Sequence, residues 1–296
     1  STARRCKTLV ILDSSFNPPT VAHMQMATSA LRDLQTQRGI AAKLKGGLDS
    51  TTAASDIRLL LLLAVNNADK EAKPASFEER LLMMQAFAGD IQRAWQDAQS
   101  QSQPQTQQQD KHDVPIDIGL TTWPYFNDKS DAIAASPDYD FSPAQATSDP
   151  AEQTPVTEQV VLAGYDTLIR IFNPKYYKPA ASEQDATTTK RTTQTPMQAA
   201  LDPFFARAHL RITMRTDADW GDREAQMAYV DGLLRGDELE SIGGRKEWAK
   251  RVEVVEGLVS EDGLVLSSTE AREAVKTRDW KKLEQLVPQG VADLIE

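Results

Sequence analysis

The sequence predicts an α/β protein with a Rossmann-like open sheet, mainly parallel, that carries helices on both faces and continues into a helical C-terminal extension. Three observations lead to this prediction. Apolar runs of strand length recur along the chain, helical patterns lie between them, and the last segment is helical in pattern almost throughout. Such alternation of strands and helices favours a parallel sheet with right-handed crossovers.

The expected strands are continuous apolar runs rather than alternating ones. Continuous runs are typical of strands that are buried on both faces of a sheet. Four runs are clear and one is weaker; in chain order they are 8–12, 57–65, 116–120 (the weaker one), 159–163 and 210–214.

Helices are expected where apolar residues recur with a period near 3.6. The segments 21–34 and 77–88 show this spacing, and a shorter apolar helix is expected at 167–172. The tail 269–296 is helical in pattern. We expect a break in it at Pro288, because proline ends or kinks a helix.

Residues 1–296 are expected to form a single domain whose helical C-terminal part spans 267–296. Three polar stretches interrupt the pattern. They are rich in Gln, Ser, Thr or Pro, have almost no large apolar residue, and lie at about 97–113, 142–155 and 180–196. Because such segments bury too little surface to offset the entropy of ordering them, we expect disordered insertions there.

Composition excludes several classes of protein. The formal net charge is −10 and no basic patch is obvious, which argues against nucleic acid as a partner. Cys6 is the only cysteine, and His23, His112 and His209 share no ligand-like spacing, so no protein-held metal site is expected. The longest apolar run, 59–65, is too short to span a bilayer. We expect a cytoplasmic protein, with the nucleus as the other compartment and no membrane partner; the sequence leaves the oligomeric state open.

A first motif follows the first strand, where Ser14-Ser15-Phe16-Asn17-Pro18-Pro19-Thr20 leads to His23. The two prolines exclude both a helix and a central strand, so a tight connection lies here. Thr20 can cap the next helix, and His23 falls in its first turn, where free N–H groups favour an anion. The plain alternative is a capped helix with a packed or solvated histidine.

A second motif, Leu266-Ser267-Ser268-Thr269-Glu270-Ala271-Arg272, also opens a helix. Ser267 and Glu270 fit a capping box, which would explain the serines without any ligand. Arg272 is not explained in this way, because a cation in the first helical turn opposes the helix dipole. An anion between the arginine and the helix start would account for it.

The two strings together resemble the signatures of the nicotinamide mononucleotide adenylyltransferase family of the nucleotidylyltransferase superfamily. The first is similar to Gly-Ser-Phe-Asn-Pro-x-Thr-x-x-His, with Ser14 in place of the glycine. The second is similar to Ile-Ser-Ser-Thr-x-Ile-Arg, with Ala271 in place of the branched residue. The Ser-Ser-Phe-Asn-Pro-Pro string looks like the fungal promoter-of-filamentation branch of this family. The resemblance implies a single nucleotidylyltransferase domain.

The resemblance also implies roles for residues of both motifs. The residues implied in catalysis are His23, Thr20 and Arg272. Those implied in ATP binding are Ser15, Phe16, Asn17, His23, Ser267, Ser268, Thr269 and Arg272. Mg²⁺ would accompany ATP on its phosphate oxygens, without a protein metal cage.

Between the motifs, the resemblance implies contacts to the acceptor mononucleotide. Gly164 and Asp166 end a strand that would face the pyridine nucleotide, although Asp166 could equally be a helix cap. Trp123 could stack on a cationic pyridine ring or pack in the core, and Tyr176 or Tyr177 could substitute for a stacking tryptophan. The residues implied in mononucleotide binding are Ser15, Phe16, Lys70, Trp123, Gly164 and Asp166. The segment 77–83 resembles a family helix that is mainly structural.

The implied reaction is transfer of AMP from ATP to nicotinamide mononucleotide, or its acid form, giving NAD, or its acid form, and pyrophosphate. Two alternatives stay open. One is a nucleotidylyltransferase with another phosphorylated acceptor. The other is an ATP-binding or weakly ATP-hydrolysing regulatory protein on the same fold, which Ser14 and Ala271 motivate.

Overall fold

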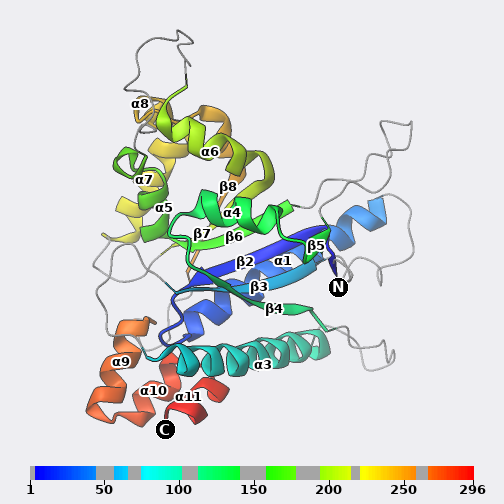
Figure 1. Cartoon of the computed structure of the whole chain (residues 1–296), viewed down its shortest axis with the longest axis vertical. Coiled ribbons are helices and arrows are strands. Elements are labelled where there is room, and N and C mark those ends of the chain that lie inside the picture. Colours follow the sequence, from blue (N-terminus) through cyan, green and yellow to red (C-terminus); the bar gives the residue numbers. More distant parts are fainter. Residues whose placement is uncertain are drawn as a thin grey trace.

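A computed structural model of the chain describes residues 4–44, 57–65, 75–101, 113–140, 158–177, 194–214, 221–257 and 266–296. At its centre lies a six-stranded sheet in the order β4-β3-β2-β6-β7-β8, in which every pair is parallel (Figure 1). The strands are β2 (Thr8–Ser14), β3 (Ile57–Ala64), β4 (Ile116–Thr121), β6 (Glu158–Gly164), β7 (Ala208–Thr213) and β8 (Val252–Val255). The short strands β1 (Arg4–Arg5) and β5 (Tyr139–Asp140) pair separately. The predicted fold class is confirmed.

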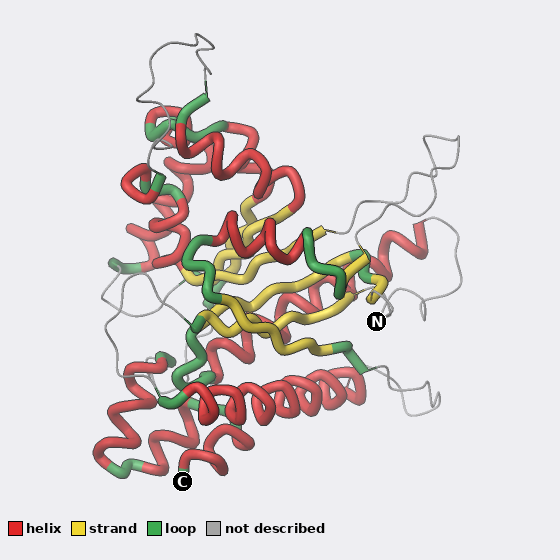
Figure 2. The backbone as a smooth tube through the Cα atoms, in the orientation of Figure 1, coloured by secondary structure: helices red, strands yellow, loops and turns green. Residues whose placement is uncertain are grey.

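Helices cover both faces of the sheet, as the backbone trace shows (Figure 2). On one side lie α1 (Val21–Leu44), α3 (Phe77–Gln101) and the C-terminal helices α9 (Ser268–Thr277), α10 (Trp280–Leu286) and α11 (Gln289–Ile295). On the other side lie α4 (Phe126–Ala134), α5 (Tyr165–Ile171), α6 (Pro196–Arg207), α7 (Arg223–Arg235) and α8 (Glu238–Ser241). Two short 3₁₀ helices, η2 (Pro174–Tyr176) and η5 (Lys246–Arg251), complete the second side.

Two hydrophobic cores, one on each face of the sheet, explain why the strands are apolar throughout. In β3 the side chains of Leu59, Leu61 and Leu63 enter the core with α1 and α3. Leu60 and Leu62 enter the core on the opposite face. Because successive side chains of a strand point to opposite faces, a strand buried on both sides needs an apolar residue at nearly every position.

The structure corrects several boundaries. The helices α1 and α3 extend ten or more residues beyond the expected 21–34 and 77–88, so the first residues of the expected insertion at 97–113 are helical. The last residues of the expected insertion at 180–196 are ordered, because Thr195 caps α6 in a capping box. The segment 142–155 and most of the other two lie outside the described residues.

The edge strand β8 was not predicted. Its burial pattern is only intermediate, and four residues are too few for a clear apolar run. Strands at a sheet edge have one neighbour and need less apolar surface, which weakens the signal on which the prediction depends.

The C-terminal tail is helical as expected, but it breaks twice rather than once. The expected break at Pro288 separates α10 from α11. The earlier break follows α9, where Arg278 adopts a left-handed conformation with φ 57° and Asp279 caps α10 through the backbone N–H of Lys282. Within the described ranges, no helix is long and apolar enough to cross a membrane.

Candidate functional site

The first motif lies at the carboxyl edge of the sheet, between β2 and α1. The chain continues from β2 to β3 on one side of β2, whereas β6 pairs on its other side. The strand order therefore reverses next to β2. In open α/β sheets, ligands bind in the crevice at such a switch point.

His23 is held in this motif by hydrogen bonds to both ring nitrogens. The backbone N–H of Thr20 donates to Nδ1 over 3.1 Å, and Thr20 Oγ1 lies 2.8 Å from the same atom. Because a backbone N–H can only donate, Nδ1 must be the acceptor and the neutral ring carries its proton on Nε2. This Nε2–H points to Ser14 Oγ at 3.1 Å. The ring is thus oriented with a donor directed toward the end of β2.

Burial also sets the charge of His23. Desolvation lowers the pKa of His23 to about 4, so the imidazole is neutral near pH 7. Its ring packs 5.4 Å from the ring of Phe16. A bound phosphate would raise this pKa, because a nearby negative charge favours the imidazolium.

Phe16 is strained so that its ring reaches the core. Its φ is 44°, a left-handed conformation that a bulky residue rarely adopts. The ring is completely buried and also packs against Phe87 of α3. Strain of this kind is retained where the surrounding structure fixes a functional loop. The side chain of Phe16 therefore anchors the motif, and only its backbone is left for a ligand.

Arg80 of α3 fixes the same loop from behind. Its Nε donates to the carbonyl of Ser15 over 3.0 Å, and its Nη2 donates to the carbonyl of Ala64 over 2.7 Å. The guanidinium is buried, which lowers its pKa, and no carboxylate among the described residues offsets this. Arg80 thus joins the carboxyl ends of β2 and β3 through two carbonyl groups.

The second motif begins α9, and its two serines have different structural roles. Ser267 Oγ accepts from the backbone N–H of Glu270 over 3.2 Å and caps the helix. The carboxylate of Glu270 does not complete the expected capping box; it pairs with Lys282 of α10 at 2.7 Å. The capping interpretation of Ser267 is therefore confirmed, and the reciprocal half of the box is wrong.

The two motifs meet although about 250 residues separate them. Ser268 Oγ donates to the carbonyl of Pro18 over 2.8 Å, and Arg272 Nη1 donates to the carbonyl of Asn17 over 2.7 Å. Arg272 Nη2 also donates to Thr269 Oγ1 over 3.1 Å. The start of α9 is thereby fixed beside the loop that precedes α1.

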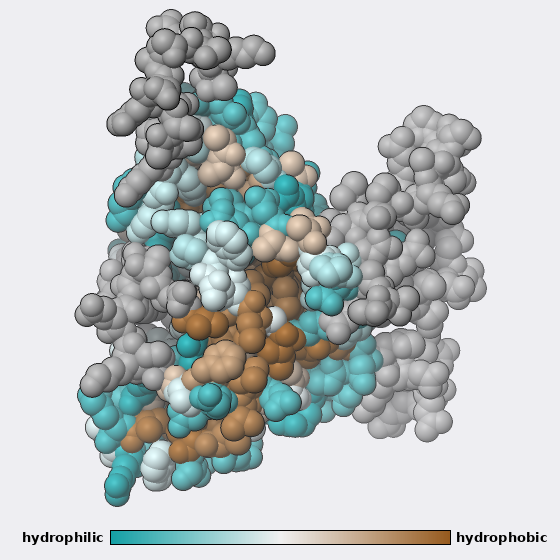
Figure 3. All heavy atoms as spheres, in the orientation of Figure 1, coloured by the Kyte–Doolittle hydropathy of each residue, from teal (hydrophilic) through white to brown (hydrophobic). Residues whose placement is uncertain are grey.

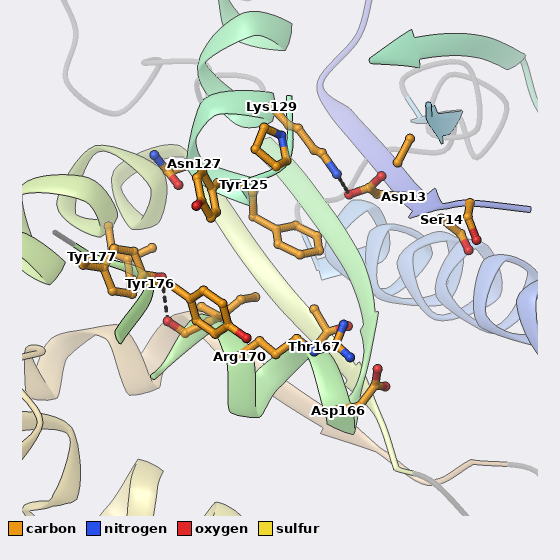
Figure 4. A pocket seen from close by; sticks show the side chains of 16 residues that line it. Asp13, Ser14, Tyr125, Asn127, Lys129, Asp166, Thr167, Arg170, Tyr176 and Tyr177 are labelled. Atoms are coloured by element: carbon orange, nitrogen blue, oxygen red, sulfur yellow. Dashed lines mark hydrogen bonds and ion pairs between the residues drawn. The ribbon is translucent and has the colours of Figure 1, made fainter. Parts of the chain in front are cut away.

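A cavity of about 240 Å³ opens next to the first motif, and its lining is polar and aromatic (Figure 4). It lies between the ends of β2, β3 and β6 and the starts of α4 and α5. The lining residues are Asp13, Ser14, Ser15, Ala64, Pro124, Tyr125, Phe126, Asn127, Lys129, Asp166, Thr167, Arg170, Ile171, Tyr176, Tyr177 and Leu201.

A buried ion pair forms part of this lining. Lys129 Nζ lies 2.5 Å from Asp13 Oδ2, and both side chains are less than a tenth exposed. Burial raises the pKa of Asp13, and the neighbouring lysine partly offsets the shift. The second carboxylate oxygen, Oδ1, is buried without a hydrogen-bond partner among the residues that the structure describes. The pair joins the start of α4 to the end of β2.

Gly164 ends β6 and Asp166 lies in the first turn of α5, where a side chain at Gly164 would require the Asp166 carboxylate to shift. A Cβ atom there would lie 2.7 Å from Asp166 Oδ1. Gly164 occupies the N-cap position of α5 without a side-chain cap, so the alternative in which Asp166 caps this helix is wrong. Asp166 instead lines the cavity.

Tyr177 is positioned on the opposite wall of this cavity. It donates its hydroxyl to the carbonyl of Ile171 over 2.6 Å, and burial raises its pKa. Figure 4 shows Tyr176 and Tyr177 on the same side of the cavity.

Trp123 is not brought into this cavity. It is 53% exposed and lines a neighbouring hollow of about 600 Å³ with Val65, Phe77 and Leu120. Figure 3 shows apolar side chains gathered on this face of the molecule. Lys70, the other expected contact to the mononucleotide, lies outside the described residues.

Three residues of the site were missed by sequence reasoning. Arg80 carried a usable signal, because it lies on the same face of its helix as the buried Met84 and Phe87. Asp13 and Lys129 carried none, since 116 residues separate the two partners.

The fold and this edge together define a Rossmann-like α/β protein with a polar and aromatic site at the switch point of a parallel sheet. Among the residues that the structure describes, no group of three or more His, Cys, Asp or Glu side chains could hold a metal ion.

Comparisons with known proteins extend this assignment. No family model matches the chain. A protein of Schizosaccharomyces pombe named "Putative nicotinamide mononucleotide adenylyltransferase" is 27% identical over 290 residues, which cover 98% of this chain and 84% of that protein. This match over nearly the whole chain supports the resemblance to the nicotinamide mononucleotide adenylyltransferase family, whose members are nucleotidyltransferase enzymes.

Two solved structures are also similar. Both are nicotinic acid mononucleotide adenylyltransferase from Plasmodium falciparum, one complexed with NaAD and one with APC. They share 14% and 13% identity with this chain at TM-scores of 0.46 and 0.43, and each comparison covers 98% of this chain and 94% of the other.

Proposed function

We propose that the protein transfers AMP from ATP to nicotinamide mononucleotide or its acid form. A 5′-phosphate oxygen of the acceptor attacks the α-phosphorus of ATP. The bond from this phosphorus to the bridging oxygen of the β-phosphate breaks, and pyrophosphate leaves. The products are NAD, or its acid form, and pyrophosphate. The proposal treats residues 1–296 as one nucleotidylyltransferase domain.

The observation that carries the proposal is the junction of the two motifs. Arg272 and Ser268 of α9 hydrogen-bond to the carbonyls of Asn17 and Pro18, so the start of α9 lies against the loop that holds His23. Two helix starts and one guanidinium meet at the switch point, where a polyphosphate needs N–H donors and positive charge. Such a site supplies positioning and electrostatic stabilisation rather than a protein nucleophile.

His23 is the residue best placed to act on the reacting phosphate. Its Nε2–H is a fixed donor, and a donor that is already oriented costs no reorganisation when charge develops. Thr20 acts as a positioning residue, because its backbone N–H and hydroxyl lie on Nδ1 and only 1% of the residue is exposed. Arg272 would hold the leaving pyrophosphate with the backbone N–H groups of Ser268 and Thr269.

The cavity beside the first motif would receive the acceptor. Four aromatic side chains in its lining, those of Tyr125, Phe126, Tyr176 and Tyr177, suit a cationic pyridine ring. Asp166 would face the acceptor from the end of β6. Contacts from Trp123 and Lys70 to the same ligand remain proposals. Contacts from the backbone of Ser15 and Phe16 are proposed as well.

Magnesium enters this proposal as part of the substrate. It would bridge phosphate oxygens of ATP and keep most of its water ligands, which is the usual manner for this ion. The donors of the site fit this arrangement, because N–H groups and a guanidinium bind phosphate oxygens and leave the metal to the phosphates.

The direct test combines the full chain with ATP, Mg²⁺ and each pyridine mononucleotide in turn. Formation of the dinucleotide, with one pyrophosphate released per dinucleotide, is the expected result. If pyrophosphate were released only with some other phosphorylated acceptor, the proposed acceptor would be wrong and the proposed reaction type would stand. Binding of ATP with no transfer to any acceptor would contradict the proposal and leave an ATP-binding regulatory protein.

A further inference from the structure

Two N–H donors of the first motif point to one oxygen atom, that of the Ser14 side chain. His23 Nε2 lies 3.1 Å from Ser14 Oγ, and the backbone N–H of Phe16 donates to the same atom over 3.4 Å. The two donors come from different elements, one from the first turn of α1 and the other from the loop after β2. Ser14 is the last residue of β2 and lines the cavity.

Both donors are fixed independently of Ser14. Thr20 holds the far side of the His23 ring through Nδ1. Arg80 holds the carbonyl of Ser15. Because the C=O and the following N–H of a trans peptide point in opposite directions, this contact directs the Phe16 N–H away from α3 and toward Ser14. The point at which the donors converge is therefore built by the surrounding structure.

An oxygen that accepts two N–H bonds at the switch point of a parallel sheet has the surroundings of a bound phosphate oxygen. A hydroxyl is a neutral acceptor, and hydrogen bonds to a charged oxygen are roughly twice as strong. A serine side chain can turn to another staggered rotamer at small cost. A phosphate oxygen could therefore displace the hydroxyl without moving either donor.

We propose that the Ser14 hydroxyl occupies the position that a phosphate oxygen of the nucleotide would take, and that it must turn away before the nucleotide binds. Ser14 is then a residue that sets affinity: it keeps the donors paired in the absence of ligand and competes with the ligand for them. The inference rests on the proposed function, since it takes the ligand to be ATP. It adds that the hydroxyl weakens binding of ATP and does not contribute to it.

The test replaces Ser14 in the full chain and measures ATP binding by calorimetry in the presence of Mg²⁺. Ser14→Gly and Ser14→Ala both remove the hydroxyl, and alanine keeps the Cβ atom in case glycine loosens the strand end. We expect both variants to bind ATP about three- to tenfold more tightly than the parent, which is the size of one net neutral hydrogen bond. In the transfer assay the gain should appear in KM for ATP rather than in kcat.

Two controls separate this effect from a change in packing. Ser29→Ala removes a hydroxyl from the same helix as His23, where it donates to the carbonyl of Met26, and should leave affinity unchanged. Adenosine, which has no phosphate, should bind the parent and the Ser14 variants alike. Thermal unfolding of every variant shows whether it is folded.

The possible results are distinguishable. Equal or weaker binding of ATP by folded Ser14→Gly and Ser14→Ala would overturn the inference, because the hydroxyl would then be neutral or a contributing donor. If such variants still form the dinucleotide, the proposed function stands without the inference. If neither the parent nor the variants bind ATP, both fail. Binding that appears only in the variants would support the inference strongly.

Discussion

The starts of α1 and α9 look alike in sequence, with a hydroxyl residue followed three positions later by a polar one, yet the structure uses them differently. At α1 the hydroxyl of Thr20 lies on the ring of His23. At α9 the hydroxyl of Ser267 caps the helix, while Ser268 and Arg272 reach across to the first motif. The first site is completed by neighbours in sequence, and the second is completed by the fold.

This difference has a consequence for the two helix starts. His23 is oriented whether or not α9 is present, because its partners lie between positions 14 and 20. Arg272 is oriented only where α9 packs against the loop 14–20. We therefore expect substitutions at α1 to affect the chemical step and substitutions at α9 to affect mainly the binding of the polyphosphate.

The largest effect is expected from His23→Ala. Loss of one preorganised donor should lower kcat/KM for dinucleotide formation by at least ~10². His209→Ala is the matched control, because this histidine lies near the amino end of β7, where it pairs with Glu158. Near-normal transfer by His23→Ala would show that the fixed donor takes no part in the reaction.

The second prediction uses the pH dependence of stability to examine the α1 start alone. The pKa of His23 in the folded protein is about 4, below its value of about 6.5 when unfolded. Between these values the unfolded chain binds the extra proton, so stability is full above pH 6.5 and falls as the pH is lowered toward 4. Because the His23 residue is only half-buried by surface area, we discount the full linkage value and expect a loss of about 2 kcal/mol.

Thermal unfolding of the parent and of His23→Gln between pH 4 and 8 measures this loss. The glutamine variant should lose less stability than the parent over the same window. Parallel curves for the two proteins would mean that His23 is not the neutral, desolvated group described above.

The third prediction concerns the α9 start. Arg272→Ala should raise KM for ATP about tenfold, because it removes a charged hydrogen-bond donor from the junction, and kcat should change less. Lys276→Ala, on the exposed side of the same helix, serves as the control. If Arg272→Ala lowered kcat and left KM for ATP unchanged, Arg272 would act in the chemical step. The two helix starts would then not differ in the way described above.

The smallest effect is expected from Ser267→Ala. It removes the cap of α9, which should cost about 1 kcal/mol of stability. Chemical denaturation measures this cost, and ATP affinity should follow only as far as α9 loosens. A loss of ATP affinity as large as that of Arg272→Ala would indicate that the Ser267 hydroxyl binds the ligand rather than the helix.

The sequence was most informative where local chemistry decides the structure. The continuous apolar run in β3 predicted a strand buried on both faces, and its leucines do alternate between the two cores. The loop at Pro18 and Pro19 was predicted because proline excludes both helix and central strand. The weakly patterned β8 and the break at Arg278 were missed, since neither depends on a run of similar residues.

The candidate site was predicted in part for the same reason. His23 and Thr20 lie together as their spacing indicated. The sequence could not show that Asp13 pairs with Lys129, or that Arg80 reaches the carbonyls of Ser15 and Ala64, because these contacts join distant segments. It also could not show that Trp123 lies in a hollow separate from Tyr176 and Tyr177.

The contact between Ser268 and Pro18 joins residues 250 positions apart, which matters for how the protein is made. At a synthesis rate of about 5–20 residues per second, the loop 14–20 exists for about 12–50 s before its partner is added. During that time the growing chain can form much of the sheet and the His23 environment, but not the junction with α9. Nascent chains are therefore expected to acquire the capacity to hold a polyphosphate only after α9 has been synthesised.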